Sequence, residues 1–408
     1  MRIYQLRYPT SKASGPPVFH EGPAVRMKGR KPPQIHTRGL KINHLGQTGI
    51  SVTDACFGTM TFGEQNTESE AHEMLSFAAD CGINFIDTAE VYPVAPRPET
   101  SGSTSCILGR WLKNRKREEF VIASKVTGRS AGLEWIPAYR AYPEEPTAPP
   151  SQPRLDSRSI VAAAEAELRR LQTDHIDLFQ IHWPDRYIPL FGSFQYRPQL
   201  QHQDIVPFTE QVEAMGKLIS QGKIRAWGLS NESCFGVMSF CAAAAALGVP
   251  PPATLQNHYS LLHRTYEGDL AETCFNLGVG LLVWSPLAGG ALAGKYLGGK
   301  LPVGSRFALF GERYARFNTE RVRQAVSRYV DIAHSAGMEP EHLALAFCRE
   351  RWLVTSTIVG STNMDQLRRN MKVFTSSETH SNGLTITPDV LRRIEAVHVE
   401  LRNPELID

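Results

Sequence analysis

The chain has 408 residues, of which 42% are hydrophobic and 21% are charged, and its formal net charge at pH 7 is +3. This length suffices for one α/β barrel of roughly 250 residues with extensions, and the small net charge gives no indication of nucleic-acid binding. The longest stretch of small apolar residues, 241–249, is too short to cross a bilayer, so we expect no membrane insertion. The 7 cysteines are scattered without CxxC spacing, which favours a reducing compartment and no metal site.

Residues 1–39 form a basic, proline-rich N-terminal extension in which Glu21 is the only acid. A basic segment poor in acids is typical of a transit peptide to a chloroplast or mitochondrion. The same composition, without periodic apolar positions, also fits a disordered extension of a cytoplasmic protein. Both interpretations stay open, and the folded domain is expected over residues 40–408.

From residue 40 onward, short apolar runs alternate with helical patterns. The first two runs, 40–43 and 51–52, flank Gly-Gln-Thr-Gly at 46–49 and predict a β-hairpin. Eight further runs predict strands that end near Gly58, Asp87, Lys125, His182, Ser230, Asn257, Ser285 and Gly360. Helices are predicted over 68–81, 157–171, 209–221, 234–247, 266–277, 365–374 and 388–401.

This alternation places the chain in the α/β class and predicts a closed (β/α)8 TIM barrel with an N-terminal hairpin. A doubly wound sheet is the alternative, but no GxGxxG follows an early strand to support it. Long loops after the strands, at 128–156, 183–207 and 288–317, are expected to cover the C-terminal face of the barrel. The first two loops carry aromatic residues that predict an apolar, aromatic-lined pocket, although some must pack the loops themselves. These residues are Trp135, Tyr139, Tyr142, Trp183, Tyr187, Phe191, Phe194 and Tyr196.

Four polar residues at or just past strand ends are candidates for catalysis: Asp87, Tyr92, Lys125 and His182. A phenol titrates near pH ~10, and a lysine ammonium beside Tyr92 would lower that pKa. Asp87 can pair with Lys125 and hold it charged, and His182 can hydrogen-bond a carbonyl oxygen. Each residue alone also fits a strand cap or a packing position. A Schiff-base lysine, as in aldolases, is a further alternative that leaves Tyr92 and His182 unexplained.

The run 289–296 nearly matches a P-loop, but Tyr296 stands where a serine or threonine should bind magnesium. Its glycines still allow backbone N–H groups to approach a phosphate closely, so we interpret the run as a loop that wraps a pyrophosphate.

Nine motifs in order resemble those of the aldo-keto reductases, and most closely the Tas-like branch of that superfamily. They are LGQTG (45–49), FGTMTFG (57–63), FIDTAEVY (85–92), IASK (122–125), DLFQIHWP (177–184), KIRAWGLSNE (223–232), LQNHYSLL (255–262), WSPLAGG (284–290) and IVGSTNMDQLRRN (358–370). The resemblance covers residues 40 to about 399. It implies an oxidoreductase that reduces aldehydes or ketones to alcohols, with Tyr92 as general acid and direct hydride transfer from NADPH.

The resemblance also implies cofactor contacts, position by position. It implies carboxamide contacts for Ser230, Asn231 and Gln256, a stacking role for Trp284, and nicotinamide-ribose contacts for Thr59 and Met60. Diphosphate contacts are implied for Ser285, Pro286, Leu287, Gly289, Lys295 and Arg306. Gly360, Ser361 and Thr362 would meet a phosphate, and Gln366 and Asn370 the adenosine.

The chain departs from the family pattern at two of these positions. Gly360 stands where many members have lysine, and Gln366 where many have arginine, although those cations help to select the 2′-phosphate of NADPH. Arg369 or Arg368 can substitute, so NADPH remains the expected cofactor. An alternative is a redox-sensing regulatory subunit similar to potassium-channel β subunits, with residual reductase activity. The carbonyl substrate and the oligomeric state are not readable from the sequence.

Overall fold

The computed structural model describes residues 39–375 and 384–407, and residues 1–38 of the predicted extension lie outside the described part. Eight parallel strands form a barrel: β3 Ala55–Gly58, β4 Phe85–Asp87, β5 Val121–Val126, β6 Ile176–Ile181, β7 Ile224–Ser230, β8 Thr254–His258, β9 Gly280–Trp284 and β10 Val354–Val359. Their order is β10-β3-β4-β5-β6-β7-β8-β9, and the ring is closed. The predicted TIM barrel is confirmed, and every observed strand ends within one residue of its predicted end.

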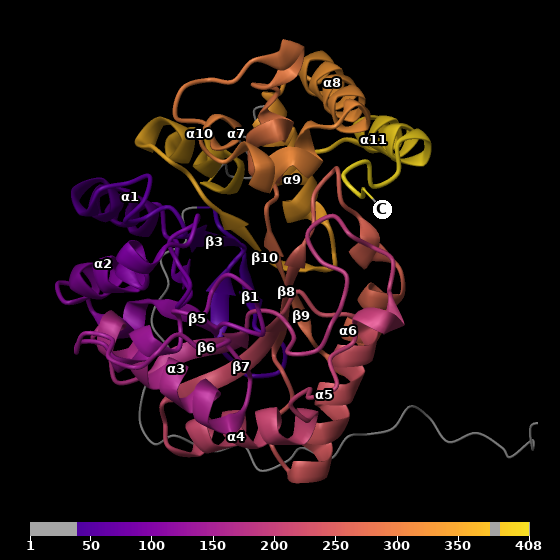
Figure 1. The fold of residues 1–408 in the computed structure, drawn as a ribbon. Helices are drawn as coiled ribbons and strands as arrows, with labels where there is room; N and C mark the ends of the chain where they lie inside the picture. The colour runs from indigo at the N-terminus through magenta and orange to yellow at the C-terminus, as the bar shows by residue number, and fades with distance from the viewer. Residues whose placement is uncertain (1–38, 376–383, 408) are drawn as a thin grey trace, which may run out of the picture. The chain divides into compact units, whose positions relative to one another are not determined.

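Helices surround these strands (Figure 1). Within the described residues they are α1 Glu68–Asp80, α2 Ser103–Leu112, α3 Ser157–Leu171, α4 Phe208–Ser220, α5 Cys234–Leu247, α6 Asp269–Leu277, α7 Arg306–Leu309, α8 Glu320–Ser335, α9 Pro340–Glu350, α10 Met364–Thr375 and α11 Pro388–Glu400. The bounds of α3 and α5 are those predicted. The predicted helix 266–277 begins later, because residues 265–267 form a separate 3-10 turn. Helices α2, α7, α8 and α9 were not predicted.

The predicted N-terminal hairpin is present as β1 (Ile42–His44) and β2 (Ser51–Thr53), which pair antiparallel. Leu45, Ile50 and Val52 are buried in one apolar cluster with side chains from the barrel strands. Those strand side chains include Cys56, Phe85, Val121, Ala123, Leu178, Ala226 and Leu282. The hairpin therefore closes the N-terminal end of the barrel.

The alternation of side chains along the strands decides which polar groups face the barrel interior. Phe85 of β4 and Ala123 of β5 belong to the inner cluster. Because successive side chains in a strand point to opposite faces, Asp87 and Lys125 lie two positions further along the same inner face. The sequence therefore places a carboxylate and an ammonium group together at the C-terminal end of the barrel.

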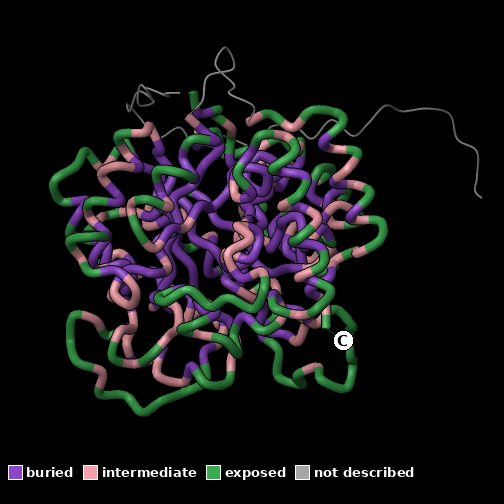
Figure 2. Tube along the Cα trace, turned by 90° about the horizontal axis from the view of Figure 1, so that it is seen from above, coloured by how far each residue is buried: buried purple, intermediate pink, exposed green. Residues whose placement is uncertain are grey.

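Burial follows this arrangement, with buried segments in the centre of the molecule and exposed segments in the outer loops (Figure 2). The largest fully buried side chains include Trp227, Phe179 and, unusually, Lys125. A buried lysine needs charged or polar partners, because moving an unpaired ammonium group out of water is costly. Across the helices of the described residues, none combines the length and the apolar character that a bilayer crossing requires.

Candidate active site

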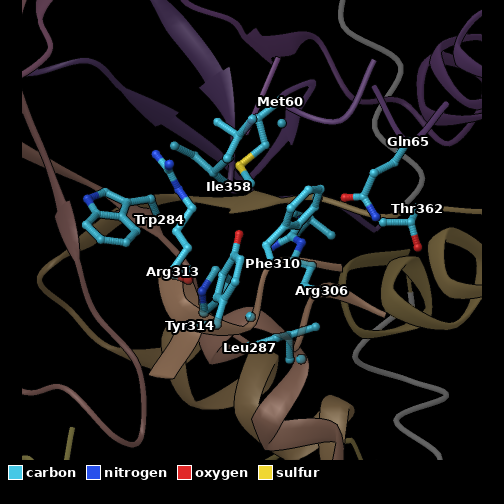
Figure 3. Close-up of a pocket in the computed structure, with 18 of the residues that line it drawn as sticks. Met60, Gln65, Trp284, Leu287, Arg306, Phe310, Arg313, Tyr314, Ile358 and Thr362 are labelled. Atoms are coloured by element: carbon cyan, nitrogen blue, oxygen red, sulfur yellow. The ribbon is translucent and has the colours of Figure 1, made fainter. Parts of the chain in front are cut away.

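A cavity of about 1040 Å³ opens at the C-terminal ends of the barrel strands. Six strands contribute residues at or near their C-terminal ends to its wall: Gly58, Asp87, Ser230, Gln256, Trp284 and Ile358. In Figure 3, Met60 and Ile358 lie on one side of this cavity, and Leu287, Arg306 and Tyr314 lie on the opposite side. The site is thus where active sites occur in α/β barrels.

Lys125 connects Asp87 to Tyr92. Its Nζ atom lies 2.6 Å from Asp87 Oδ2 and donates to the backbone oxygen of Thr88 at 2.9 Å. The same ammonium group donates to Tyr92 Oη at 3.4 Å. Lys125 is fully buried and lies behind the cavity wall, whereas Asp87 and Tyr92 reach the cavity. The two side chains that reach the cavity are therefore joined through a buried cation.

The second oxygen of Asp87 is also bonded. Gln256 Nε2 donates to Asp87 Oδ1 at 2.8 Å, so both carboxylate oxygens have donors. Burial by itself lowers the pKa of Lys125, but Asp87 and Tyr92 outweigh it, and the pKa lies above its usual value. Lys125 is consequently charged at neutral pH.

The pKa of Tyr92 differs from the sequence-based expectation. Burial raises it, Lys125 lowers it, and the net pKa lies above the usual value of a tyrosine. Lys125 acts in the expected direction, but the loss of hydration of the phenolate is the larger effect. In this structure Tyr92 is therefore a protonated phenol with a cation beside its oxygen.

His182 follows β6 directly and lies beside Tyr92. The two ring centroids are 5.8 Å apart with the planes at 80°. Burial, and secondarily the charge of Lys125, hold the pKa of His182 well below its usual value. The imidazole is therefore neutral at pH 7. Its Nδ1 atom is buried without a hydrogen-bond partner in the described part of the chain.

The structure brings nearly all of the predicted cofactor residues to the same cavity. Its wall includes Thr59, Met60, Ser230, Asn231, Gln256, Trp284, Ser285, Pro286, Leu287, Gly289, Lys295, Arg306, Gly360, Thr362, Gln366, Arg369 and Asn370. Ser361 is the exception, since it is buried behind the wall and accepts a hydrogen bond from Asn370 Nδ2 at 3.2 Å. The Gln366 side chain is also occupied, because its oxygen accepts from the Thr362 N–H and hydroxyl at 3.1 Å each.

Backbone strain is concentrated along this wall. Asn231, Ser285 and Ala288 have φ values of 53°, 58° and 48°, a left-handed conformation that non-glycine residues seldom adopt. Such strain persists where the surrounding structure enforces it, and it clusters at ligand sites. The observation therefore supports a binding role for the ends of β7 and β9.

Three cations lie together in the part of the cavity formed by the third loop and α10. Lys295 is half-buried, and burial together with the charges of Arg306 and Arg369 lowers its pKa, which Glu341 opposes. Arg369 Nε donates to Glu341 Oε1 at 3.1 Å. Arg368 takes another direction, since it lies over the Phe77 ring of α1 and outside the cavity wall. Like charges held this close favour the binding of an anion.

The expectation of an aromatic-lined pocket is only partly right. Of the aromatic residues named from the first two loops, Trp183 and Phe191 line the cavity. The others lie outside its wall: Trp135, Tyr139, Tyr142, Tyr187, Phe194 and Tyr196. The third loop supplies Phe310, Tyr314 and Phe317 instead.

Sequence reasoning also missed several polar residues of the wall. Arg313 and Arg316 come from the third loop, Gln65 from the segment after β3, and Glu341 from α9. The mixture of arginine and aromatic residues at 313–317 could have indicated that Arg313 and Arg316 line the cavity. Nothing local in the sequence distinguishes Gln65 or Glu341 from surface residues.

Several known proteins have sequences similar to that of this chain. The sequence pattern of the "Aldo/keto reductase family" matches residues 55–382. The chain is 42% identical to "Protein tas" of Escherichia coli over 360 residues, which cover 88% of this chain and 98% of that protein. It is 36% identical to an "Aldo-keto reductase" of Babesia bovis over 299 residues, which cover 70% of this chain and 97% of that protein. It is also 31% identical to a "Probable voltage-gated potassium channel subunit beta" of Arabidopsis thaliana over 364 residues, which cover 88% of this chain and 96% of that protein.

The family match spans most of the folded domain and includes every strand of the barrel. The chain therefore belongs to the aldo/keto reductase family and is an oxidoreductase.

Proposed function

We propose that this protein reduces aldehydes or ketones to alcohols with NADPH, and that Tyr92 donates the proton. The observation that carries the proposal is that Lys125 donates hydrogen bonds to both Asp87 and Tyr92, which line the cavity. A protonated phenol is a proton donor, and a cation beside its oxygen stabilises the phenolate that forms when the proton leaves. His182 adds a neutral imidazole on the same side.

In this mechanism a carbonyl oxygen lies against Tyr92 and His182. The cofactor, when bound, supplies a hydride to the carbonyl carbon. The carbonyl oxygen takes the electron pair of the broken π bond and receives the proton of Tyr92 Oη, which gives the neutral alcohol. The Lys125 ammonium stabilises the resulting phenolate, and Asp87 fixes the position of Lys125.

The residues of the wall fit a nicotinamide dinucleotide. The cations Lys295, Arg306 and Arg369 suit its phosphates, and their mutual effect on the pKa of Lys295 is the structural observation that supports an anion there. At the carboxamide end, Gln256 Nε2 is bonded to Asp87, so the oxygen of Gln256 is the group left to accept from the amide. Gly289 and Gly290 have φ values of 66° and 94° and give backbone N–H groups close access to the diphosphate.

Preference for NADPH over NADH rests on Arg369. With Gly360 and Gln366 in place of cations, Arg369 is the arginine of α10 that reaches the cavity. An arginine gives the 2′-phosphate of NADPH charge-assisted bonds that a 2′-hydroxyl cannot match.

A redox-sensing regulatory subunit is the second candidate. What favours it is the similarity to the plant protein named as a potassium-channel β subunit. Capture of a stable membrane partner would favour the regulator, whereas rapid turnover of small aldehydes would favour the enzyme.

The test is NADPH oxidation by the purified full-length protein with a panel of aldehydes and ketones, followed at the near-ultraviolet band of the cofactor. Tyr92→Phe removes only the hydroxyl, so it should retain cofactor binding and lose at least ~100-fold in carbonyl reduction. Tyr187→Phe is the matched control, because Tyr187 lies outside the cavity wall. Near-normal reduction by Tyr92→Phe would refute the role of Tyr92, and a panel without any substrate would refute the reductase.

A further inference from the structure

A buried carboxylate outside the proposed reaction path lies close to the cavity. Glu405 belongs to the C-terminal tail that follows α11, and it is 0% exposed. One of its oxygens accepts a hydrogen bond from His263 Nδ1 and lies 3.2 Å from His258 Nδ1. Its other oxygen lies 2.8 Å from Arg316 Nε. The tail is thereby joined to the end of β8, to the segment after it, and to the third loop.

His258 connects this carboxylate to the cavity wall. Its ring stacks on the indole of Trp284, with centroids 4.6 Å apart and planes at 17°, and on His263 at 4.3 Å and 20°. Within the described residues, the Nε2 atom of His258 is buried without a hydrogen-bond partner. The bond from Nδ1 to Glu405 is therefore the polar contact that orients the His258 ring, and this ring supports the plane of Trp284.

The same tail contacts both loops that close over the cavity. The Ile407 N–H donates to the backbone oxygen of Gly192 in the second loop at 3.0 Å. In the third loop, the Arg316 guanidinium lies 4.4 Å from the centre of the Phe317 ring and 5.8 Å from that of Phe191. Phe191 and Phe317 both line the cavity. Glu405 and Ile407 of the tail thus contact His258, His263, Arg316 and Gly192.

His258, His263 and Glu405 hold potential ligand atoms within 4.8 Å of one another, as in a metal site. Two observations favour a hydrogen-bonded cluster instead. Arg316 already balances the charge of the carboxylate. The Nδ1 atoms of both imidazole rings contact the same oxygen of Glu405, so these donor atoms are already used in the carboxylate cluster.

The protons of the cluster are also accounted for without a metal. The His258 and His263 rings can each donate Nδ1–H to the carboxylate, and the Thr265 hydroxyl lies 2.7 Å from His263 Nε2. Burial lowers the pKa of His258 to about 4, so its ring is neutral at physiological pH.

We propose that Glu405 is a positioning residue for the nicotinamide cofactor. Through His258 it fixes the plane of Trp284, and together with Ile407 it holds the second and third loops over the cavity. The C-terminal tail therefore sets cofactor affinity without touching the reacting atoms. The effect on affinity rests on the proposed function of the site, whereas the effect on Trp284 does not.

The first arm of the test uses the protein without cofactor. The near-ultraviolet circular dichroism of Trp284, obtained by subtracting the spectrum of Trp284→Phe, should be lost in Glu405→Gln and His258→Ala. It should be retained in His258→Phe, because that change keeps a flat ring against the indole. Glu400→Gln is the matched control, since Glu400 lies in the same C-terminal region and pairs with Arg328 at the surface. An unchanged Trp284 signal in folded Glu405→Gln and His258→Ala would overturn the proposal.

The second arm measures the Kd of NADPH and the steady-state constants. Glu405→Gln should bind NADPH about 10-fold more weakly, while kcat at saturating cofactor stays within about twofold. Equal weakening by Glu400→Gln, or a Kd unchanged in Glu405→Gln, would overturn the role in affinity. If Glu405→Gln does not fold, His258→Ala takes its place, because the carboxylate then keeps Arg316 and His263. If the unaltered protein binds no NADPH, the proposed function is refuted. Loss of the Trp284 signal in Glu405→Gln would still support the ring-positioning role of Glu405 in that case.

Discussion

Burial and charge act in opposite directions on the hydroxyl of Tyr92. The sequence shows that Lys125 and Tyr92 both lie at or just past predicted strand ends, which is enough to predict the charge effect. It does not show how completely the loops exclude water, and that exclusion decides the sign of the net pKa shift. A raised pKa suits a proton donor in the resting state, because the phenol is then fully protonated at neutral pH. The nearby cation becomes most important when the phenolate forms.

Two adjacent arginines of α10 provide a test of cofactor choice. Arg369 lines the cavity, whereas Arg368 lies over Phe77 and 3.7 Å from Asp365. Arg369→Gln should weaken NADPH binding by about 10-fold or more and leave NADH binding nearly unchanged, because a charge-assisted bond to phosphate contributes roughly 1.5–3 kcal/mol. Dissociation constants for both cofactors, measured by titration, check this.

Arg368→Gln is the control for that change, with the same loss of charge one residue away. It should leave the ratio of the two dissociation constants as it is in the unaltered protein. An equal loss of NADPH preference in both variants would point to the general charge of α10 rather than to a contact. Equal affinities for NADPH and NADH in the unaltered protein would refute the preference itself.

At the scale of helices and strands, the barrel was predictable because each strand is a short apolar run that ends at a polar residue. Helix α2 was hidden because it buries polar and small residues. Ser105 donates to the buried carboxylate of Glu167 at 2.7 Å, and a Cβ at Gly109 would come 2.2 Å from the Arg170 backbone oxygen. Both depend on α3, which is distant in sequence.

Helix α8 was missed for a different reason, since its signal is local. Thr319 caps its start, and Val322, Val326, Tyr329 and Ala333 form one buried face. The pattern follows a long loop whose end could not be located from composition, and this obscured the beginning of the helix. In the loops themselves, the choice of which aromatic residues line the cavity depends on contacts across the whole mouth of the barrel.

The hairpin at the N-terminal end of the barrel gives a prediction at this scale. Gly46 has φ 49°, and a Cβ there would lie 2.5 Å from the Ala253 backbone oxygen and 2.9 Å from that of Gly278. Gly46→Ala should therefore push the hairpin away from the β8 and β9 ends and destabilise the protein by roughly 2–4 kcal/mol. The thermal midpoint, compared at one scan rate, measures the effect.

Gly49→Ala separates steric contact from backbone strain. Gly49 also has a positive φ, 73°, but nothing lies within 4 Å of its Cβ position. Its replacement should cost only the strain of a left-handed alanine, about 1 kcal/mol. Similar midpoints for the two alanine variants would show that the hairpin does not pack closely on the barrel.

For the whole molecule, we propose that the folded unit begins near residue 39. Residues 1–39 contain no periodic apolar face and so offer little surface to bury against the cost of ordering a chain. A chain that starts at Gly39 should express in soluble form, with unchanged steady-state constants and thermal midpoint. Loss of solubility after the truncation would show that the removed segment stabilises the barrel.

A fusion to a fluorescent reporter tests the targeting interpretation of the same segment. Residues 1–39 should carry the reporter to a chloroplast or mitochondrion if they form a transit peptide. A reporter that stays diffuse in the cytosol would remove that interpretation and leave the reductase proposal intact.

The closure of the barrel by β10 against β3 has a consequence for synthesis on the ribosome. The proposed proton-transfer residues all precede residue 183, whereas Lys295, Arg306 and Arg369 are translated later, and β10 pairs with the first strand of the ring. The segments that carry Asp87 and Lys125 are thus synthesised early. The set of three cations that suits the cofactor phosphates is complete only when α10 has been synthesised. A message cut short before residue 354 would lack β10 and leave the ring open, and one cut short before residue 369 would lack Arg369. The complete cofactor site is therefore expected only after β10 has joined β3 and α10 has been synthesised.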